Sequence, residues 1–77
     1  MDAVYLKDPE LTNIFKVHIT EEGDMVADGS NCDKGKLERR SFIHELEYRE
    51  WVEENNLQEM EETQYDRLSQ IYNYSEA

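Results

Sequence analysis

The apolar positions of this 77-residue chain follow a period of two in the first part and a helical period later. In "NIFKVHIT", Phe15, Val17 and Ile19 alternate with polar residues, as in a strand with one buried face. "VYLK", Val4 to Lys7, is a shorter strand candidate that precedes the turn "DPEL". "EEGD" is typical of a hairpin turn, with Gly23 able to take a positive φ, and "MVA" indicates the returning strand. These segments predict a three-stranded antiparallel meander.

The turn-rich stretch "DGSNCDKG", Asp28 to Gly35, breaks this pattern, and a helical spacing follows it. The apolar residues then fall on two sides of one helix, with Phe42, Ile43 and Leu46 on the first side and Leu37, Tyr48, Trp51 and Val52 on the second. A helix that is apolar on two sides is normally sandwiched. We expect it to lie between the sheet and either a second helix or a partner.

A second helix is predicted after "NNL", where Asn56 and Glu59 have the spacing of a capping box. Its apolar residues share an arc of about 140° and are Leu57, Met60, Tyr65, Leu68, Ile71 and Tyr72. The segment from Met60 to Tyr74 should pack on the first helix as an antiparallel hairpin. The predicted fold is therefore α+β, a three-stranded antiparallel meander followed by a two-helix antiparallel hairpin (βββαα), in a single small acidic domain over residues 1–77.

The composition predicts a small core. Leu, Ile, Val and Phe together number 16, just above the level at which a high net charge predicts disorder. Five Tyr, three Met and one Trp favour a folded chain. Because so short a chain buries little surface, we expect the fold to have low stability. A dimer or a bound partner would supply part of the missing burial.

The charge narrows the choice of partners. The chain holds 19 acidic and 8 basic residues, a net charge of −11, and from residue 45 onward only Arg49 and Arg67 oppose ten acids. Such a surface repels phosphate backbones and anionic lipid heads and is attracted to basic clefts. We therefore predict a basic protein surface as the partner, with neither direct nucleic-acid binding nor membrane binding.

The compartment is predicted from cysteine usage and from the apolar runs. Cys32 is the single cysteine, so it forms no intrachain disulfide. No apolar run approaches the roughly 18 residues of a spanning helix, and "MDAVYLKDPE" lacks the basic flank and apolar stretch of a signal peptide. We expect a cytoplasmic protein, in the host cytoplasm if it is viral.

The motifs that would carry chemistry are incomplete. "HELEY" begins like the zinc-protease motif His-Glu-x-x-His, but Tyr48 stands where the second histidine is needed. "DGSNCDKGKLE" lacks the glycine and the final acid of a calcium loop, and Cys32, His18 and His44 have no paired metal-ligand spacing. There is no phosphate-binding glycine loop and no nucleophile elbow. We predict no enzyme activity, no metal and no cofactor.

Four basic residues precede the first predicted helix: Lys34, Lys36, Arg39 and Arg40. They can be interpreted as a phosphate-binding patch. Since acids surround them, we favour ion pairs with the chain's own carboxylates, such as Asp33 and Glu38, worth a few tenths of a kcal/mol each.

Carboxylates repeat at helical spacing on both predicted helices. Side chains three or four residues apart on a helix stand about 5 to 6 Å from each other. One ladder is Glu47, Glu50, Glu53 and Glu54, and a second is Glu59, Glu62 and Asp66. Such like charges destabilise a helix, and a net charge of about 2 to 8 suffices for the solubility of a small domain. The excess therefore favours a binding surface that imitates the charge spacing of a nucleic-acid backbone, over the alternative of a merely solvated acidic face.

Aromatic residues lie among these acids. We expect Tyr48 and Tyr74 to be exposed contact residues, while Trp51, Tyr65 and Tyr72 fill the interface between the helices. Aromatic side chains anchor interfaces that charges steer. By size, acidity and a sheet-plus-helices build, the chain resembles the phage-encoded nucleic-acid mimics that block restriction enzymes, CRISPR nucleases or repair glycosylases. The resemblance lies in composition and shape class and covers no motif, so no functional residue is transferred.

The leading hypothesis is a non-enzymatic inhibitor that occupies the basic cleft of a nuclease or another nucleic-acid-binding protein. Its predicted partner-binding residues are Glu47, Tyr48, Glu50, Trp51, Glu53, Glu54, Glu59, Glu62, Asp66 and Tyr74. The first alternative is a structural interaction module or antitoxin-like neutraliser that binds through apolar surface around Trp51, Tyr48 and Val52. The second is an obligate homodimer that buries the second apolar side of the first helix.

Overall fold

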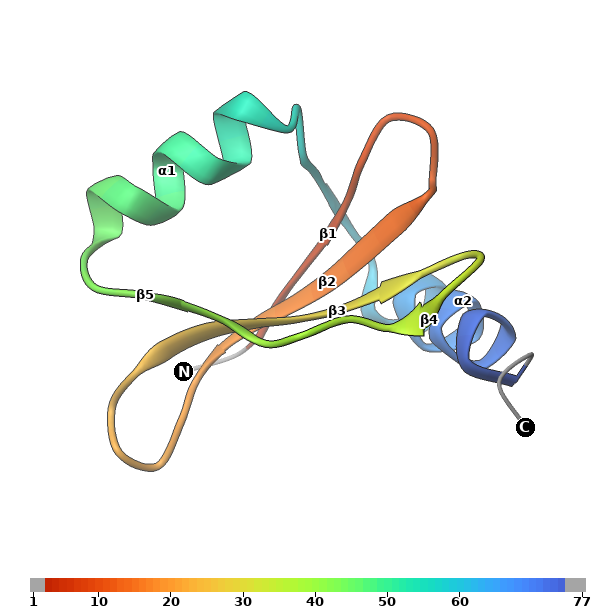
Figure 1. Cartoon of the computed structure of the whole chain (residues 1–77), viewed down its shortest axis with the longest axis horizontal. Coiled ribbons are helices and arrows are strands. Elements are labelled where there is room, and N and C mark those ends of the chain that lie inside the picture. The colour runs from red at the N-terminus through yellow and green to blue at the C-terminus, as the bar shows by residue number, and fades with distance from the viewer. Residues whose placement is uncertain (1–2, 75–77) are drawn as a thin grey trace.

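The computed structural model describes residues 3–74 of the chain, which form an α+β fold with one antiparallel sheet of six strands and two helices (Figure 1). The predicted α+β class is confirmed, with more strands than the sequence indicated. In chain order the elements are β1 (Val4–Lys7), β2 (Asn13–Ile19), β3 (Met25–Asn31), β4 (Gly35–Lys36), β5 (Arg40–Phe42), α1 (Glu45–Glu54), β6 (Gln58–Met60) and α2 (Glu62–Tyr74).

The strands follow the order β4-β3-β2-β1-β6, with β5 also paired to β3. Since β4 pairs with the end of β3 at Ser30 and Asn31 and β5 with its beginning at Met25 to Ala27, the two short strands form one interrupted edge of the sheet. The opposite edge is β6, which pairs with β1. The chain passes from one edge to the other through α1.

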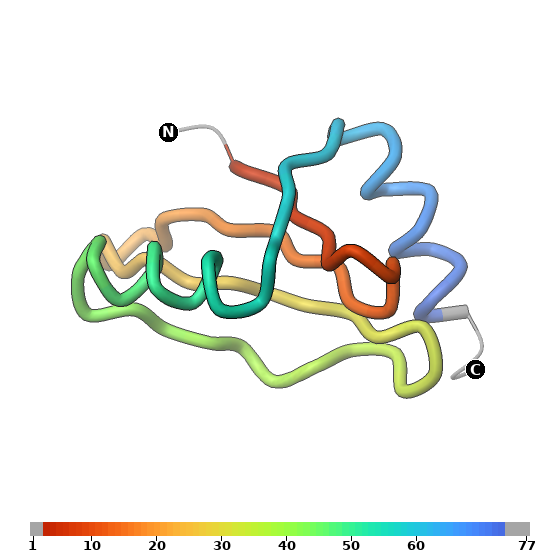
Figure 2. Tube along the Cα trace, turned by 90° about the horizontal axis from the view of Figure 1, so that it is seen from above, coloured from red at the N-terminus to blue at the C-terminus, as the bar shows by residue number. Residues whose placement is uncertain are grey.

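The two helices cover opposite faces of the sheet. Alternate residues of each strand point to opposite faces, and Leu6, Val17 and Ala27 share a core cluster with Trp51 of α1. Ile14, on the other face, is fully buried in a second cluster with Tyr65 and Tyr72 of α2. Figures 1 and 2 both place α1 toward one end of the long axis and α2 toward the other.

The predicted meander is confirmed in β1, in β2 and in the turn at Gly23, whose φ is 92°. The third strand is longer than expected, because the "DGSN" assigned to a turn continues β3. Gly29 explains the error. It lies opposite Phe15, and a Cβ at Gly29 would stand 2.7 Å from the Phe15 ring. The glycine makes room for an aromatic ring and does not end the strand.

The first helix begins later than predicted. Leu37 donates its N–H to Gly29 O at 2.9 Å, and Phe42 lies in β5 with its side chain in the core, so these two apolar residues belong to the sheet edge. The helix starts at Glu45 after His44. The predicted helical surface of Leu37, Tyr48, Trp51 and Val52 is therefore shorter by one residue.

The predicted helical hairpin is wrong, because β6 lies between the two helices. Asn56, taken as the start of the second helix, ends the first: its φ is 53°, its N–H bonds Glu53 O at 3.2 Å, and the N–H of Leu57 bonds Val52 O at 3.0 Å. This is a Schellman end. Residues 58–60 then pair with β1, which would otherwise be an open sheet edge, and Figure 2 shows this segment crossing β1 on its way to α2.

Candidate functional site

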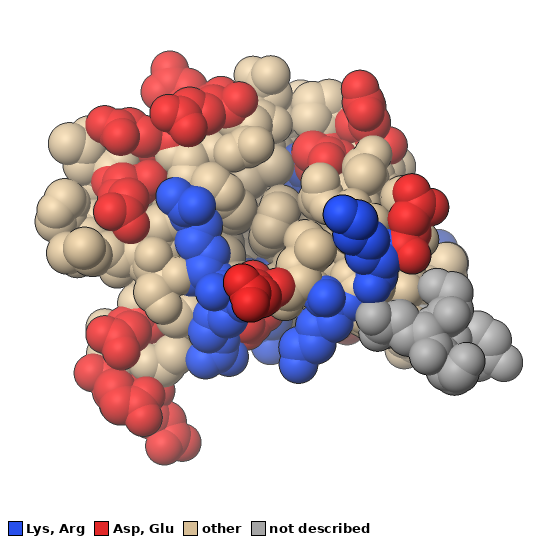
Figure 3. Space-filling view, viewed as in Figure 1, with Lys and Arg blue, Asp and Glu red and all other residues tan. Residues whose placement is uncertain are grey.

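The outer face of α1 carries carboxylates without cationic partners. Glu50, Glu53 and Glu54 are exposed, and none of them forms an ion pair within the described residues 3–74. The helix has one ion pair in this part of the chain, Arg49 Nη2 to Glu45 Oε1 at 3.3 Å, in which both side chains are about 70% exposed. In Figure 3 acidic side chains gather at the upper left, where Figure 1 shows α1.

Two residues of the predicted site have structural roles. Glu47 is half-buried, and its Oε1 accepts the N–H of Ile43, two residues before the helix, at 3.4 Å. Trp51 is only 9% exposed, with its ring 4.9 Å from that of Phe15 and 5.1 Å from that of Phe42. Trp51 is thus a core residue between α1 and the sheet, and its contact with a partner stays a prediction.

The second predicted ladder is divided between two elements. Glu59 lies in β6, opposite Leu6 of β1, and therefore on the face that α1 covers. Glu62 and Asp66 are exposed residues of α2, on the opposite face. Tyr74 is the last residue of α2, and its side chain lies outside the described part of the structure. The seven acids of the two predicted ladders thus form no single continuous surface.

Two hollows lie along one flank of α1, on the side of the sheet that this helix covers. They measure about 440 Å3 and about 160 Å3, and both are lined by Tyr48. On α1 the larger hollow is lined by Arg49, Val52 and Glu53 and the smaller by Glu45. These positions share one side of a helix because they are three or four residues apart. We call this feature the α1 groove.

Tyr48 lies at the centre of the α1 groove, and its environment is apolar and acidic. Its side chain is half-buried against the core cluster, with its ring 5.5 Å from that of Phe42. Burial, and then the negative charge of Glu59, raise the pKa of Tyr48 above its ordinary value. The predicted contact role of Tyr48 is therefore compatible with its position, at the wall of a groove and not on an open face.

Most of this groove was not predictable from the sequence. The smaller hollow is also lined by residues of β1, β2 and β3, namely Val4, Val17, His18, Ile19 and Met25, and the larger one by Asn56, Leu57 and Gln58. Of these residues, Gln58 belongs to β6, which pairs with β1. The signal in the sequence was "NNLQEM", which resembles a Schellman end followed by a short extended segment as well as it resembles a helix start.

Two exposed apolar residues stand at the start of α1. Ile43 is 84% exposed and Leu46 62%. The sequence assigned them to the first apolar side of the first helix, together with Phe42, which is buried in the core. An exposed apolar pair beside carboxylates is the usual composition of a small interface, in which charges surround an apolar contact.

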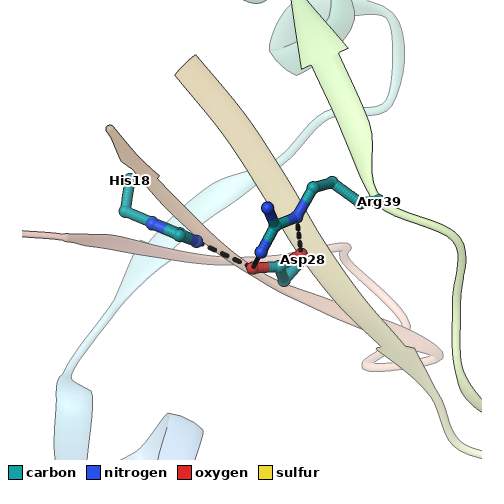
Figure 4. Close-up of polar contacts among 3 residues, drawn as sticks. All are labelled: His18, Asp28 and Arg39. Atoms are coloured by element: carbon teal, nitrogen blue, oxygen red, sulfur yellow. Dashed lines mark hydrogen bonds and ion pairs between the residues drawn. The ribbon is translucent and has the colours of Figure 1, made fainter. Parts of the chain in front are cut away.

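The basic residues form a band across the centre of Figure 3, where Figure 1 shows β4 and β5. Arg39 pairs with Asp28, Nε to Oδ1 at 2.7 Å, and His18 Nε2 lies 2.7 Å from Asp28 Oδ2 (Figure 4). Arg40 lies over the Phe42 ring at 5.3 Å. Arg39 thus pairs across the sheet with Asp28, and not with Asp33 or Glu38 as the sequence suggested. Positive charges on an edge strand also discourage pairing with another sheet.

We expect Asp28 to make stability depend on pH. The hydrogen bond from Arg39, helped by His18 and opposed by burial, holds the pKa of Asp28 below its ordinary value of 3.8. A carboxylate with a lowered pKa stabilises the fold fully above its unfolded pKa and loses this contribution as the pH falls through the folded pKa. Urea unfolding at pH 6 and pH 3 should show a deficit of Asp28→Asn at pH 6 that shrinks at pH 3. Because the site is partly exposed, the deficit should be small.

Asp24→Asn is the matched control, since Asp24 is exposed in the β2–β3 turn. It removes one carboxylate without removing a described ion pair. An Asp28→Asn deficit of the same size at both pH values would contradict the role given to this pair.

Neither described helix is long and apolar enough to cross a membrane. Within residues 3–74, no three His, Cys, Asp or Glu side chains come together as a metal-binding group. Cys32 is exposed and carries a free thiol. In comparisons with known proteins, no family model, no curated protein and no solved structure matches this chain.

Proposed function

We propose that this protein is a non-enzymatic acidic inhibitor that acts in the cytoplasm by occupying the basic cleft of a nucleic-acid-binding protein, as a mimic of DNA or RNA. The observation that carries the proposal is the row of exposed carboxylates on α1, Glu50, Glu53 and Glu54, without ion pairs in the described chain. Phage-encoded inhibitors of restriction enzymes and CRISPR nucleases represent this class of function.

The position of these acids supports a binding role. Glu53 and Glu54 occupy the last turn of α1, which contains no basic residue. The negative end of the helix dipole lies there, so carboxylates at this end lower the stability of the helix by about 0.3 to 1 kcal/mol each. A small domain gains nothing in folding from this arrangement. A basic partner that neutralises these charges on binding explains it.

The mimicking surface is the α1 side of the molecule. Glu50, Glu53 and Glu54 lie on α1, and Glu59 projects from the same face of the sheet. The acids of α2 are on the other face of the sheet. They therefore add to the long-range electrostatic field of the protein but do not take part in the contact made by α1. Long-range charge mainly accelerates encounter, while the contact surface sets the lifetime of the complex.

The apolar interaction module is a second candidate, favoured by the exposure of Ile43 and Leu46. In this alternative the two side chains enter an apolar recess of the partner, and the acids only surround the contact. Binding would then survive high salt, since screening weakens exposed charge pairs and leaves apolar burial intact.

The test is capture of partners from bacterial lysate with the tagged protein, with parallel washes at low salt and at about 0.5 M salt, where the Debye length is below 10 Å. We expect a nuclease or other nucleic-acid-handling protein that is lost at high salt, and whose DNA or RNA binding falls when the purified inhibitor is added. A partner that stays at high salt and binds nucleic acid equally well with the inhibitor present would refute the mimic and favour the apolar module.

A further inference from the structure

The α1 groove is more apolar than the outer face of the helix, and Glu53 borders both surfaces. The smaller hollow, of about 160 Å3, is lined mainly by apolar side chains, Val4, Val17, Ile19 and Met25 among them. Ligand pockets for small molecules typically measure roughly 300 to 1,000 Å3. The smaller hollow is below this range and suits a single side chain of a larger partner.

The larger hollow continues the groove past Tyr48 toward the C-terminal end of α1. Val52 and Leu57 give it apolar walls, and Asn56 and Gln58 add amide groups. Glu53 lines it, and Glu59 is near enough for its charge to act on the Tyr48 phenol. Two hollows that share Tyr48, with apolar side chains and carboxylates among their lining residues, suit a length of polypeptide.

The charges of the groove determine whether its occupant is positively or negatively charged. Glu45 and Glu53 line it, and the negative charge of Glu59 acts on Tyr48 in its wall. The one Lys or Arg among the described lining residues is Arg49, which already pairs with Glu45 at 3.3 Å. A phosphate, a nucleotide or an acidic peptide would meet uncompensated negative charge there, whereas lysine and arginine side chains would neutralise it.

We infer that the α1 groove binds a basic amphipathic segment of the target protein, with one apolar side chain in the smaller hollow and lysine or arginine side chains at Glu53 and Glu59. The inference rests on the proposed function for the basic character of the target, and it adds a named contact to that function. The outer carboxylates of α1 attract the target, and the groove holds one of its segments.

This division assigns different kinetics to the two surfaces. Exposed charges act mainly on the association rate and are weakened by salt, whereas buried apolar contacts act mainly on the dissociation rate. At a given salt concentration, a target that fills the groove therefore dissociates more slowly than a target held by exposed charges alone. A mimic that binds through charge alone would lose both its fast association and its slow dissociation when salt is added.

The test uses two 12-residue synthetic peptides of equal charge as probes. The first places leucines at helical spacing among lysines, and the second has serine in place of each leucine. Both are titrated into the ¹⁵N-labelled full-length protein and followed by NMR. We expect the leucine peptide to bind about ten- to a hundredfold more tightly, with nuclear Overhauser contacts from its leucine methyls to the Tyr48 ring and the Met25 methyl.

Two double variants with the same change in charge locate the cationic contacts. Glu53→Gln with Glu59→Gln should weaken the leucine peptide by about tenfold. Glu50→Gln with Glu54→Gln, on the outer face of α1, should weaken it by less than about threefold. All four side chains are exposed and the substitutions preserve their size, so both variants should fold, which circular dichroism checks.

Three results would overturn the inference. The first is equal binding of the two peptides, with chemical-shift changes spread over every acidic residue. The second is an equal loss of affinity in the two double variants. The third is a change of the Tyr48 and Met25 signals with protein concentration alone, which would make a second copy of the chain the occupant of the groove. If neither peptide binds but a salt-sensitive target is still captured from lysate, the groove inference is wrong and the proposed mimic function stands. If the leucine peptide binds but no such target is captured, the groove inference stands and the mimic function is wrong.

Discussion

Replacing Trp51 by alanine should lower the free energy of unfolding by about 3 to 5 kcal/mol, the usual cost of removing a large aromatic side chain from a core. Trp51 is 9% exposed and is surrounded by Phe15, Phe42 and Tyr48, with ring centroids 4.9, 5.1 and 6.2 Å away. It is the main link between α1 and the sheet. A domain of this size is stabilised by roughly 4 to 12 kcal/mol in total, so this loss is a large fraction of the stability of the fold.

The measurement is thermal unfolding followed by far-UV circular dichroism, because the variant lacks the only tryptophan and has no matching fluorescence signal. At about 4 to 8 °C per kcal/mol, Tm should fall by at least about 12 °C. Leu46→Ala is the control on the same helix, since Leu46 is 62% exposed and should change stability by no more than about 0.5 kcal/mol. Equal Tm values for the two variants would contradict the assignment of Trp51 to the core.

The strand pattern of the N-terminal part was predictable because it is local. Phe15 and Val17 alternate with Lys16 and His18, and this alternation has one structural meaning when turn residues bound it on both sides. Gly29 shows where local reasoning fails. A glycine in a polar stretch indicates a turn, but this one lies in a strand because Phe15, fourteen positions earlier in the chain, places its ring over it.

The helical hairpin was predicted wrongly for a related reason. A segment of three residues, Gln58–Met60, has too little length for its own period to be visible, so its neighbours decided the assignment. Its actual conformation is set by pairing with the edge of β1, and this pairing cannot be predicted from the local sequence. The positive φ at Asn56 and the burial of Leu57 belong to the end of α1, and they direct the chain toward that edge.

The consequence for the candidate site is a redistribution of the acids. The sequence established how many carboxylates there are and which of them share a helix, and Glu50, Glu53 and Glu54 do share one exposed face. It placed Glu62 and Asp66 beside them because it assumed packed helices. The sheet separates the two groups, and the sequence did not indicate the α1 groove, to which the three-residue strand contributes Gln58.

Because the acids of α1 and α2 lie on opposite faces of the sheet, the effect of net charge on binding can be distinguished from the effect of the α1 surface. The triple variant Glu50→Lys, Glu53→Lys and Glu54→Lys should abolish binding to the captured target, with an affinity loss of at least about a thousandfold, because three attractive contacts become repulsive ones that cost several kcal/mol together. A second triple variant, Glu10→Lys, Glu21→Lys and Asp66→Lys, changes three exposed acids elsewhere. Both variants bring the formal net charge from −11 to −5, so a loss caused by net charge alone would be equal in the two.

The stability of the α1 triple variant makes the experiment decisive. Lysines at Glu53 and Glu54 face the negative end of the helix dipole and relieve repulsion between neighbouring carboxylates, so the free energy of unfolding should stay the same or rise by about 0.5 to 2 kcal/mol. A variant that folds better and binds no target shows that these acids lower stability for the sake of recognition. Isothermal titration calorimetry against the target, with Tm measured on the same samples, reports both quantities. Equal affinity losses in the two triple variants would leave α1 without a special role and make the whole negative field of the protein responsible for binding.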